Sequence, residues 1–228
     1  MAATALGDLG FLASHRGTNV QAVLDACKTG RLGARPAIVI GNNRDAEVLA
    51  RARRAGVPAY HLSTTTHPEP EALDRTIRDT LIRHGVGLVV LAGYMKKLGP
   101  ETLAYYAGRV INIHPALLPH FGGLGMYGTR VHEAVLASRA TETGVTIHLV
   151  DGDYDRGAIL AQCRVPVLPR DSPETLAARV LAREHGFLVE TLERMLAGEL
   201  ALPGPFSVAP RDKGRQEVVS TCTPRSTR

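Results

Sequence analysis

Short apolar segments alternate with longer stretches of helical spacing along most of this 228-residue chain. The pattern predicts strands at 9–13, 37–40, 59–62, 88–91, 110–113, 145–150 and 159–167, and helices at 19–28, 46–55, 69–84, 100–107, 129–137 and 173–196. The run at 88–91 is wholly apolar, which is typical of a strand buried on both faces. Alternating strands and helices favour an α/β domain with a mainly parallel sheet and helices on both faces.

The last two predicted strands are joined only by residues 151–157. A parallel crossover needs about a dozen residues or more, so we expect these strands to form an antiparallel C-terminal extension.

The sequence also predicts where two helices begin or end. Asp45 is the expected cap of the helix at 46–55, and Gly56 is expected to end it. Ser172, followed by Pro173, is the expected cap of the long last helix.

Charge and composition divide the chain into a body and a tail. We expect residues 1–202 to form a single domain, and residues 203–228, which lack apolar periodicity, to form a basic and flexible tail. This tail supplies three of the five net positive charges, so the body is only weakly basic. No lysine–arginine stripe interleaved with aromatics is present, which argues against a nucleic-acid partner.

Other compositional features exclude further classes. No stretch approaches 18 consecutive apolar residues, which argues against a membrane span, and residues 1–8 do not resemble a secretion signal. The three cysteines are far apart in sequence and form no C-x-x-C pair, so neither a disulfide framework nor a cysteine metal site is expected. A cytoplasmic location is the expectation that fits these features.

A polar turn at 14–19, Ser-His-Arg-Gly-Thr-Asn, lies between the first predicted strand and helix. In a parallel sheet this turn lies at the carboxyl edge, where ligands bind. Free N–H groups at a helix start suit a phosphate, and Gly17 permits close approach of the backbone. The turn matches neither a dinucleotide fingerprint nor a P-loop, and an ordinary polar turn with a helix cap is an equally good interpretation.

Asn112 and His114 lie two positions apart at the end of the strand predicted at 110–113. Alternate residues of a strand point to the same face, so the amide and the imidazole should converge. Two converging donors can stabilise a developing oxyanion. A structural turn with a hydrogen-bonded histidine is the less favoured alternative.

Three acidic residues, Asp151, Asp153 and Asp155, alternate in the loop at 151–157. The spacing resembles the opening of a calcium loop, but Arg156 stands where glycine is needed and Gln162 where glutamate is needed. One carboxylate could instead partner a histidine and stabilise its imidazolium. For Asp151 and Asp153, a solvated acidic turn is the preferred interpretation.

Taken together, the motifs resemble those of the glycinamide ribonucleotide (GAR) transformylases, over about residues 9–200. The matching elements are R-G-T-N at 16–19, L-A-G-Y-M at 91–95, N-I-H-P-A-L-L-P at 112–119, G-V-T-I-H at 144–148, D-R-G at 155–157 and E-H at 184–185. The N-I-H-P element is specific to folate-dependent formyl-transfer enzymes, and R-G-T-N narrows the resemblance to the GAR branch. The resemblance implies a Rossmann-like sheet.

The resemblance also implies a reaction of purine (IMP) biosynthesis. The formyl donor and co-substrate would be 10-formyltetrahydrofolate, and the acceptor would be the amine of 5′-phosphoribosylglycinamide, with no metal and no permanently bound cofactor. The amine would attack the formyl carbon directly and form a tetrahedral oxyanion. Asn112 and His114 would donate to this oxyanion, while Asp155 would hold His114 and route the proton.

The substrate contacts follow from the same resemblance. Arg16, Gly17, Thr18 and Asn19 would hold the acceptor phosphate, and Glu184 would hold the ribose hydroxyls. The folate pocket would be formed by Leu91, Met95, Lys96, Lys97, Leu98, Asn112, Asp151 and Asp155. The partners would be small molecules, with no nucleic acid or membrane, and the chain would be a monomer or a homodimer.

Three features depart from the family pattern. His15 stands where glycine is common, and Ala158 replaces a usual proline. The glycine-rich segment at 122–128 is longer and richer in glycine than in the usual form of the family, and its glycine density predicts a mobile flap.

Alternatives remain within the family and outside it. A methionyl-tRNA formyltransferase or a formyltetrahydrofolate deformylase usually carries a further domain for which this chain has no length, and a sugar-nucleotide formyltransferase lacks the R-G-T-N turn. The alternative from another class is a phosphometabolite-binding module without catalysis, suggested by the basic tail and the pI of about 9.4.

Overall fold

The computed structural model describes residues 6–202 of the chain. The predicted tail at 203–228 lies outside the described residues, so its expected flexibility stays a prediction. No helix within 6–202 is long and apolar enough to cross a membrane.

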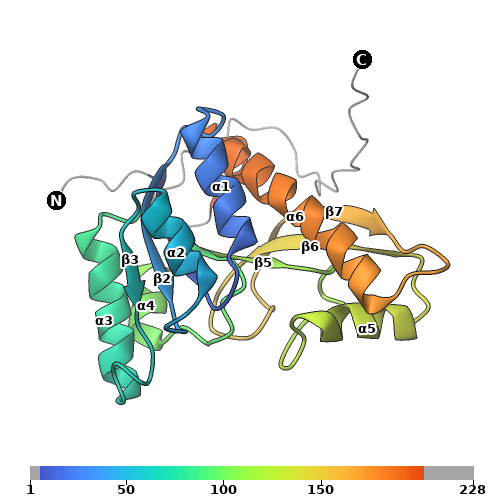
Figure 1. Ribbon diagram of the computed structural model, residues 1–228, viewed down its shortest axis with the longest axis horizontal. Helices are drawn as coiled ribbons and strands as arrows, with labels where there is room; N and C mark the ends of the chain where they lie inside the picture. The colour runs from blue at the N-terminus through green and yellow to red at the C-terminus, as the bar shows by residue number, and fades with distance from the viewer. Residues whose placement is uncertain (1–5, 203–228) are drawn as a thin grey trace.

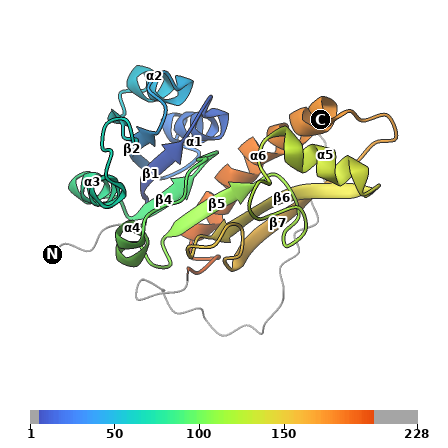
Figure 2. The same ribbon diagram turned by 90° about the horizontal axis from the view of Figure 1, so that it is seen from below.

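Seven strands form one mixed sheet in the order β3-β2-β1-β4-β5-β6-β7 (Figures 1 and 2). Their bounds are β1 Asp8–Ala13, β2 Arg35–Gly41, β3 Ala59–His61, β4 Leu88–Leu91, β5 Val110–His114, β6 Glu142–Leu149 and β7 Ile159–Pro166. The first five strands pair in parallel, whereas β5–β6 and β6–β7 pair antiparallel. This arrangement confirms the expected Rossmann-like sheet with an antiparallel C-terminal extension.

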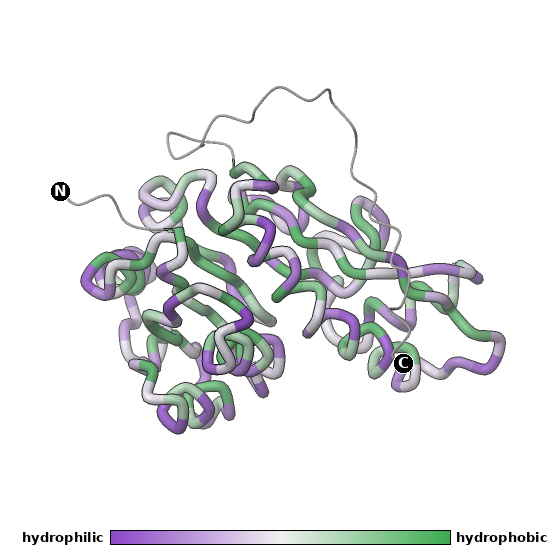
Figure 3. The backbone as a smooth tube through the Cα atoms, turned by 90° about the horizontal axis from the view of Figure 1, so that it is seen from above, coloured by the Kyte–Doolittle hydropathy of each residue, from purple (hydrophilic) through white to green (hydrophobic). Residues whose placement is uncertain are grey.

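Helices cover both faces of this sheet, as expected (Figure 1). They are α1 Thr18–Lys28, α2 Glu47–Arg54, α3 Pro70–Arg83, α4 Pro100–Tyr105, α5 Thr129–Ala137 and α6 Pro173–Leu196. The buried apolar side chains of α1, α2 and α6, together with Val135 of α5, belong to one hydrophobic cluster, and those of α3 belong to a second cluster beside which α4 packs. The strands between the two clusters form much of the hydrophobic interior in Figure 3.

Side-chain alternation along β4 divides the core between the two faces. Leu88 and Val90 join the cluster under α1 and α6, while Val89 and Leu91 join the cluster under α3. All four residues are at most 6% exposed, so this strand is buried on both faces. The all-apolar run was therefore correctly interpreted, because helices on both sides leave no solvated face.

The helix ends include one confirmed cap and one wrong prediction. The Ser172 side chain accepts a hydrogen bond from the Thr175 N–H in a capping box, as expected. Asp45 does not cap α2, because the N-cap is Ala46 and no side chain satisfies the first turn. The N–H of Val48, a donor that a cap would satisfy, is instead bonded to the His15 carbonyl at 3.1 Å.

The sheet register aligns residues that are far apart in sequence. Leu12 pairs with Leu91, Leu91 with Asn112, and Asn112 with His148, so these four residues form one row across four strands. The chain order reverses between β1 and β4, and the turns that follow these parallel strands meet at the same edge. Ligands of open α/β sheets bind at such a switch point.

Candidate active site

A cavity of about 670 Å³ opens at this edge of the sheet. It is bounded by the turn after β1, the ends of β4 and β5, the loops at 123–128 and 152–155, and α6. The predicted site residues in its lining are Arg16, Gly17, Thr18, Asn19, Leu91, Met95, Lys96, Lys97, Leu98, Asn112, His114, Asp155 and Glu184. Its volume suits small-molecule ligands, and it brings together every predicted site residue except Asp151.

Asp151 lies apart from this group. Its side chain is exposed and does not line the cavity, and its Oδ1 lies 3.4 Å from the Asp153 backbone nitrogen within the same loop. Asp151 therefore lies in an exposed acidic turn outside the cavity lining, and its contact with folate stays a prediction.

The turn between β1 and α1 presents a row of free backbone donors. Among the described residues, the N–H groups of residues 15–20 have no intramolecular partner. Gly17 adopts the left-handed conformation at φ 65° directly before Thr18 begins α1. A Cβ at Gly17 would lie 2.2 Å from Val48 Cγ2, so glycine is required here by both conformation and space. Consecutive free N–H groups at a helix start can bind an anion.

Glu184, on α6, reaches the beginning of α1. Its Oε2 accepts a hydrogen bond of 2.6 Å from Asn19 Nδ2, and the side chain is almost fully buried. Burial raises the pKa of Glu184 to about 7, although the Asn19 amide favours the ionised form. The Asn19 side chain is therefore held by Glu184, and the Asn19 backbone N–H stays available to a ligand.

Four polar side chains converge at the centre of the cavity. Asn112 Nδ2 lies 3.1 Å from His148 Nε2 and 3.5 Å from Asp155 Oδ1. Asp155 also lies between the two histidines: its Oδ2 is 3.6 Å from His114 Nδ1, and its Oδ1 is 3.4 Å from His148 Nε2. Asn112 and His114 therefore do lie on one face, and Asp155 contacts both histidines rather than His114 alone.

Backbone carbonyls determine which histidine nitrogens carry protons. His114 Nε2 is 2.8 Å from the Phe121 carbonyl, and His148 Nδ1 is 2.7 Å from the Leu149 carbonyl. A carbonyl oxygen only accepts, so both of these nitrogens donate. In the neutral rings the unprotonated nitrogens face Asp155, and an added proton converts either contact into an ion pair.

Burial and charge act in opposite directions on this group. Burial lowers the pKa of His114, and the nearby Asp155 carboxylate and the Phe121 carbonyl only partly offset that effect. For Asp155, burial acts to raise the pKa, but the hydrogen bond from His148 and the charge of His114, which these rings supply when protonated, outweigh it, so its pKa lies below the usual value. This cluster of side chains therefore favours an ionised Asp155 carboxylate beside a His114 ring that loses its proton readily.

The loop after His114 is held by a hydrogen-bond network on β6 and β7. Thr146 Oγ1 donates to the Ala116 carbonyl at 2.6 Å and accepts from the Leu118 N–H at 3.0 Å. Gln162 Nε2 donates both to Thr146 Oγ1 and to the Leu118 carbonyl at 2.9 Å. These bonds fix the backbone immediately after the histidine.

The segment after β4 forms the other wall of the cavity. The Met95 N–H donates to Ser14 Oγ at 2.7 Å, and the Ser14 N–H donates to the Gly93 carbonyl, so this segment is joined to the turn after β1. Lys97 Nζ lies 5.9 Å from the centre of the Tyr154 ring across the cavity mouth. Burial raises the pKa of Tyr94 to about 12, so its hydroxyl stays protonated.

His148 and His132 also line the cavity, and the motifs assigned neither of them a role. His148 reaches Asp155 because antiparallel pairing sets it opposite Asn112, a register that the sequence does not reveal. His132, on α5, is 4% exposed, and its Nδ1 has no hydrogen-bond partner. Burial and the neighbouring His114 lower the pKa of His132. No sequence signal distinguished His132 from a histidine of the hydrophobic core.

No group of three or more potential metal ligands occurs among the residues that the structure describes. The converging groups of the cavity are hydrogen-bond donors, one carboxylate and titratable rings. Chemically, they can stabilise negative charge on an oxygen and move a proton.

Comparison with known proteins gives consistent matches. Residues 9–192 match the model of the formyl transferase family. A chloroplastic phosphoribosylglycinamide formyltransferase from Arabidopsis thaliana is 39% identical over 81% of this chain and 63% of its own length. The Escherichia coli phosphoribosylglycinamide formyltransferase is 36% identical over 84% of this chain and 88% of its own length. The chain thus spans less than two thirds of the Arabidopsis relative.

Solved structures share the fold. A glycinamide ribonucleotide transformylase from Symbiobacterium toebii superposes with a TM-score of 0.80 at 40% identity, covering 86% of this chain and 91% of that one. A formyltetrahydrofolate deformylase from Pseudomonas syringae gives a TM-score of 0.74 at 26% identity over 86% of this chain and 62% of that one. The fold is thus shared by proteins with different named reactions, and the function must be argued from the site.

Proposed function

The chain belongs to the formyl transferase family, and from that premise we propose that it transfers the formyl group of 10-formyltetrahydrofolate to the amine of 5′-phosphoribosylglycinamide. One observation carries the proposal. Asn112, His114 and Asp155 converge in the same cavity that residues 15–19, which carry free N–H groups, also line. The proposed phosphate site and the proposed site for acyl chemistry therefore share a single cavity.

The acceptor occupies the part of the cavity nearest α1. Its phosphate accepts hydrogen bonds from the N–H groups that begin at His15, and Arg16 adds positive charge beside them. Its ribose hydroxyls lie against Glu184, which is buried on α6 and bonded to Asn19 of α1. The glycinamide amine then points toward Asn112.

The folate occupies the part nearest the end of β4. Leu91, Met95 and Leu98 supply apolar wall there, and the neighbouring backbone offers hydrogen bonds. Lys96 and Lys97 are exposed at the mouth, where they can attract an anionic cosubstrate. Holding both substrates in one cavity converts a bimolecular reaction into an effectively intramolecular one.

The reaction begins when the acceptor nitrogen attacks the formyl carbon. The carbonyl electron pair moves to oxygen, and Asn112 Nδ2 donates to the resulting oxyanion. His114 Nε2 becomes the second donor after it exchanges the Phe121 carbonyl for the oxyanion. When the oxyanion collapses, the bond from the formyl carbon to the folate nitrogen breaks and the formyl–amine bond remains.

One proton must pass from the acceptor amine to the folate nitrogen. Asp155 is the base that faces the reacting centre, and its low pKa keeps it ionised before the attack. The proton is shared with His114 and His148, whose unprotonated nitrogens lie within 3.6 Å of the carboxylate. The protonated group then delivers a proton to the leaving nitrogen.

A deformylase would use water in place of the acceptor amine, and a binding module would catalyse neither reaction. A turnover assay of 10-formyltetrahydrofolate, with and without 5′-phosphoribosylglycinamide, distinguishes these alternatives. The proposal predicts release of tetrahydrofolate only with the acceptor, and loss of that release in His114→Ala. Equal release without acceptor would identify a deformylase, and no release in either case would favour a binding module.

A further inference from the structure

Three consecutive carbonyls of the turn after β1 are held by one segment, residues 43–51, which we call the α2 brace. Asn43 Nδ2 donates to the Ser14 carbonyl at 2.5 Å, the Val48 N–H to the His15 carbonyl at 3.1 Å, and Arg51 Nε to the Arg16 carbonyl at 2.9 Å. The α2 brace therefore determines the direction of each of these carbonyls.

Carbonyl direction determines the direction of the N–H groups. In a trans peptide, the C=O of one residue and the N–H of the next point in opposite directions. Because the carbonyls of residues 14–16 face the α2 brace, the N–H groups of residues 15–17 face away from it. These are three of the six consecutive donors without an intramolecular partner among the described residues.

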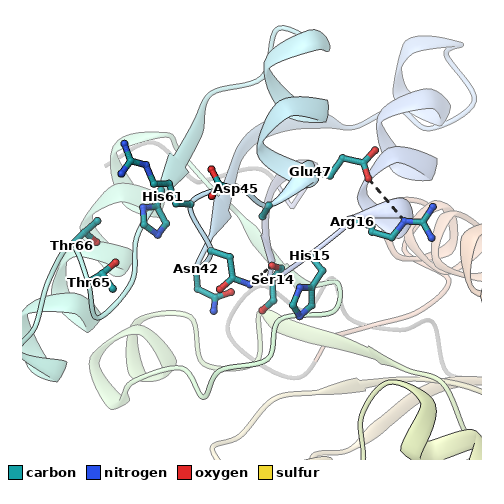
Figure 4. A pocket seen from close by; sticks show the side chains of 12 residues that line it. Ser14, His15, Arg16, Asn42, Asp45, Glu47, His61, Thr65 and Thr66 are labelled. Atoms are coloured by element: carbon teal, nitrogen blue, oxygen red, sulfur yellow. Dashed lines mark hydrogen bonds and ion pairs between the residues drawn. The ribbon is translucent and has the colours of Figure 1, made fainter.

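Water could otherwise compete for these carbonyls. A second cavity of about 1050 Å³, which shares His15 and Arg16 with the one described above, opens beside Ser14, His15 and Arg16 (Figure 4). Solvent that reaches this side could hydrate the carbonyls and let the peptide planes rotate. Direct donors from the α2 brace hold them in one orientation.

The Arg51 side chain contacts two further residues besides the Arg16 carbonyl. Its Nη2 lies 2.6 Å from Glu47 Oε1 and its Nη1 3.4 Å from Gln21 Oε1, so it joins α2, α1 and the turn. The Arg51 side chain is 18% exposed and lines neither cavity. Glu47 also lies 4.0 Å from Arg16 Nε, a contact drawn in Figure 4.

We propose that Arg51 is a positioning residue for the acceptor phosphate: it makes no contact with the substrate and holds the N–H groups of the turn in the orientation that binds an anion. This inference rests on the proposed function, because it assigns the turn to the acceptor's phosphate. A preorganised donor array binds an anion more tightly than one that must first be ordered. The effect should appear in acceptor binding and not in folate binding.

The test compares Arg51→Gln with Arg54→Gln, which makes the same change in charge at an exposed position of the same helix. We expect Arg51→Gln to raise KM for the acceptor about tenfold and to leave kcat and KM for 10-formyltetrahydrofolate within about twofold. Arg54→Gln should match the parent. Arg51→Lys, which keeps the charge and a donor, should recover part of the acceptor affinity.

Binding of inorganic phosphate, followed by NMR shifts of the backbone amides of residues 15–20, provides a readout that does not require turnover. The proposal predicts a dissociation constant for phosphate that is about tenfold higher in Arg51→Gln than in the parent. Equal constants in the two proteins would overturn it, as would an equal rise in both KM values. An inactive parent that still binds phosphate at these amides would refute the proposed function and leave the positioning role to be decided by the phosphate comparison.

Discussion

Glu184 gives the sharpest quantitative prediction, because a buried carboxyl should make the stability of the fold depend on pH. Burial is the main cause that raises its pKa from the usual value of 4.5 to about 7. Each pKa unit corresponds to about 1.4 kcal/mol, so full ionisation of Glu184 costs roughly 3 kcal/mol of unfolding free energy. Glu184→Gln removes this cost, and its amide oxygen can still accept from Asn19.

The direction in which stability changes with pH follows from which state, folded or unfolded, binds the Glu184 proton. Between pH 4.5 and about 7, the folded state holds the Glu184 proton and the unfolded state has lost it, so stability falls as pH rises through this window. At pH 5 most of the cost is still absent, whereas at pH 8 it is fully present. The unfolding free energy of Glu184→Gln minus that of the parent should therefore be about 2.5 kcal/mol larger at pH 8 than at pH 5.

The assay is urea unfolding of both proteins at matched pH values from 5 to 8.5, with the difference taken at each pH. Contributions from other titrating groups cancel in that difference where they do not interact with Glu184. Parallel stability curves for the two proteins would refute the reasoning, because they would show that Glu184 ionises at its usual pKa in the folded state.

Three further predictions concern the site and its supports. Asp155→Asn should leave the fold intact, as judged by circular dichroism, and lower kcat by about 100-fold to 1000-fold; activity within tenfold of the parent would contradict the role of Asp155. Gly17→Ala should lower the unfolding free energy by about 1–3 kcal/mol, since its Cβ would overlap Val48 at a positive φ, and an unchanged urea midpoint would contradict this account. Ser172→Ala should cost about 1 kcal/mol in the same assay through loss of the α6 cap, whereas Ser172→Thr should keep most of the stability.

Periodicity made most of the fold predictable. The run at 88–91 could be recognised as a buried strand because both of its faces are covered, and the long helix after Ser172 because its cap is local in sequence. The prediction that Asp45 caps α2 was wrong because the contact that decides it is distant in sequence. The Val48 N–H that a cap would satisfy is bonded to the His15 carbonyl, more than thirty residues earlier in the chain, and no local pattern records such a contact.

The candidate site was predictable where motifs end at one edge of a parallel sheet. Asn112 and His114 share a strand, and the turn at 14–19 had to lie at the same edge. His148 and His132 were not assigned to the cavity, because their positions depend on antiparallel register and on how α5 packs. The placement of Asp151 outside the cavity likewise reflects a loop conformation that its acidic spacing does not determine.

Direct transfer of the formyl group is the central claim, and an isotope label follows it most directly. The protein would be incubated with 10-formyltetrahydrofolate labelled with carbon-13 in the formyl group and with 5′-phosphoribosylglycinamide, and the product identified by NMR. The account predicts that the label appears as a formamide on the acceptor amine, in equal amount to the tetrahydrofolate released. Label recovered as free formate would contradict it, because water rather than the amine would then have attacked the formyl carbon.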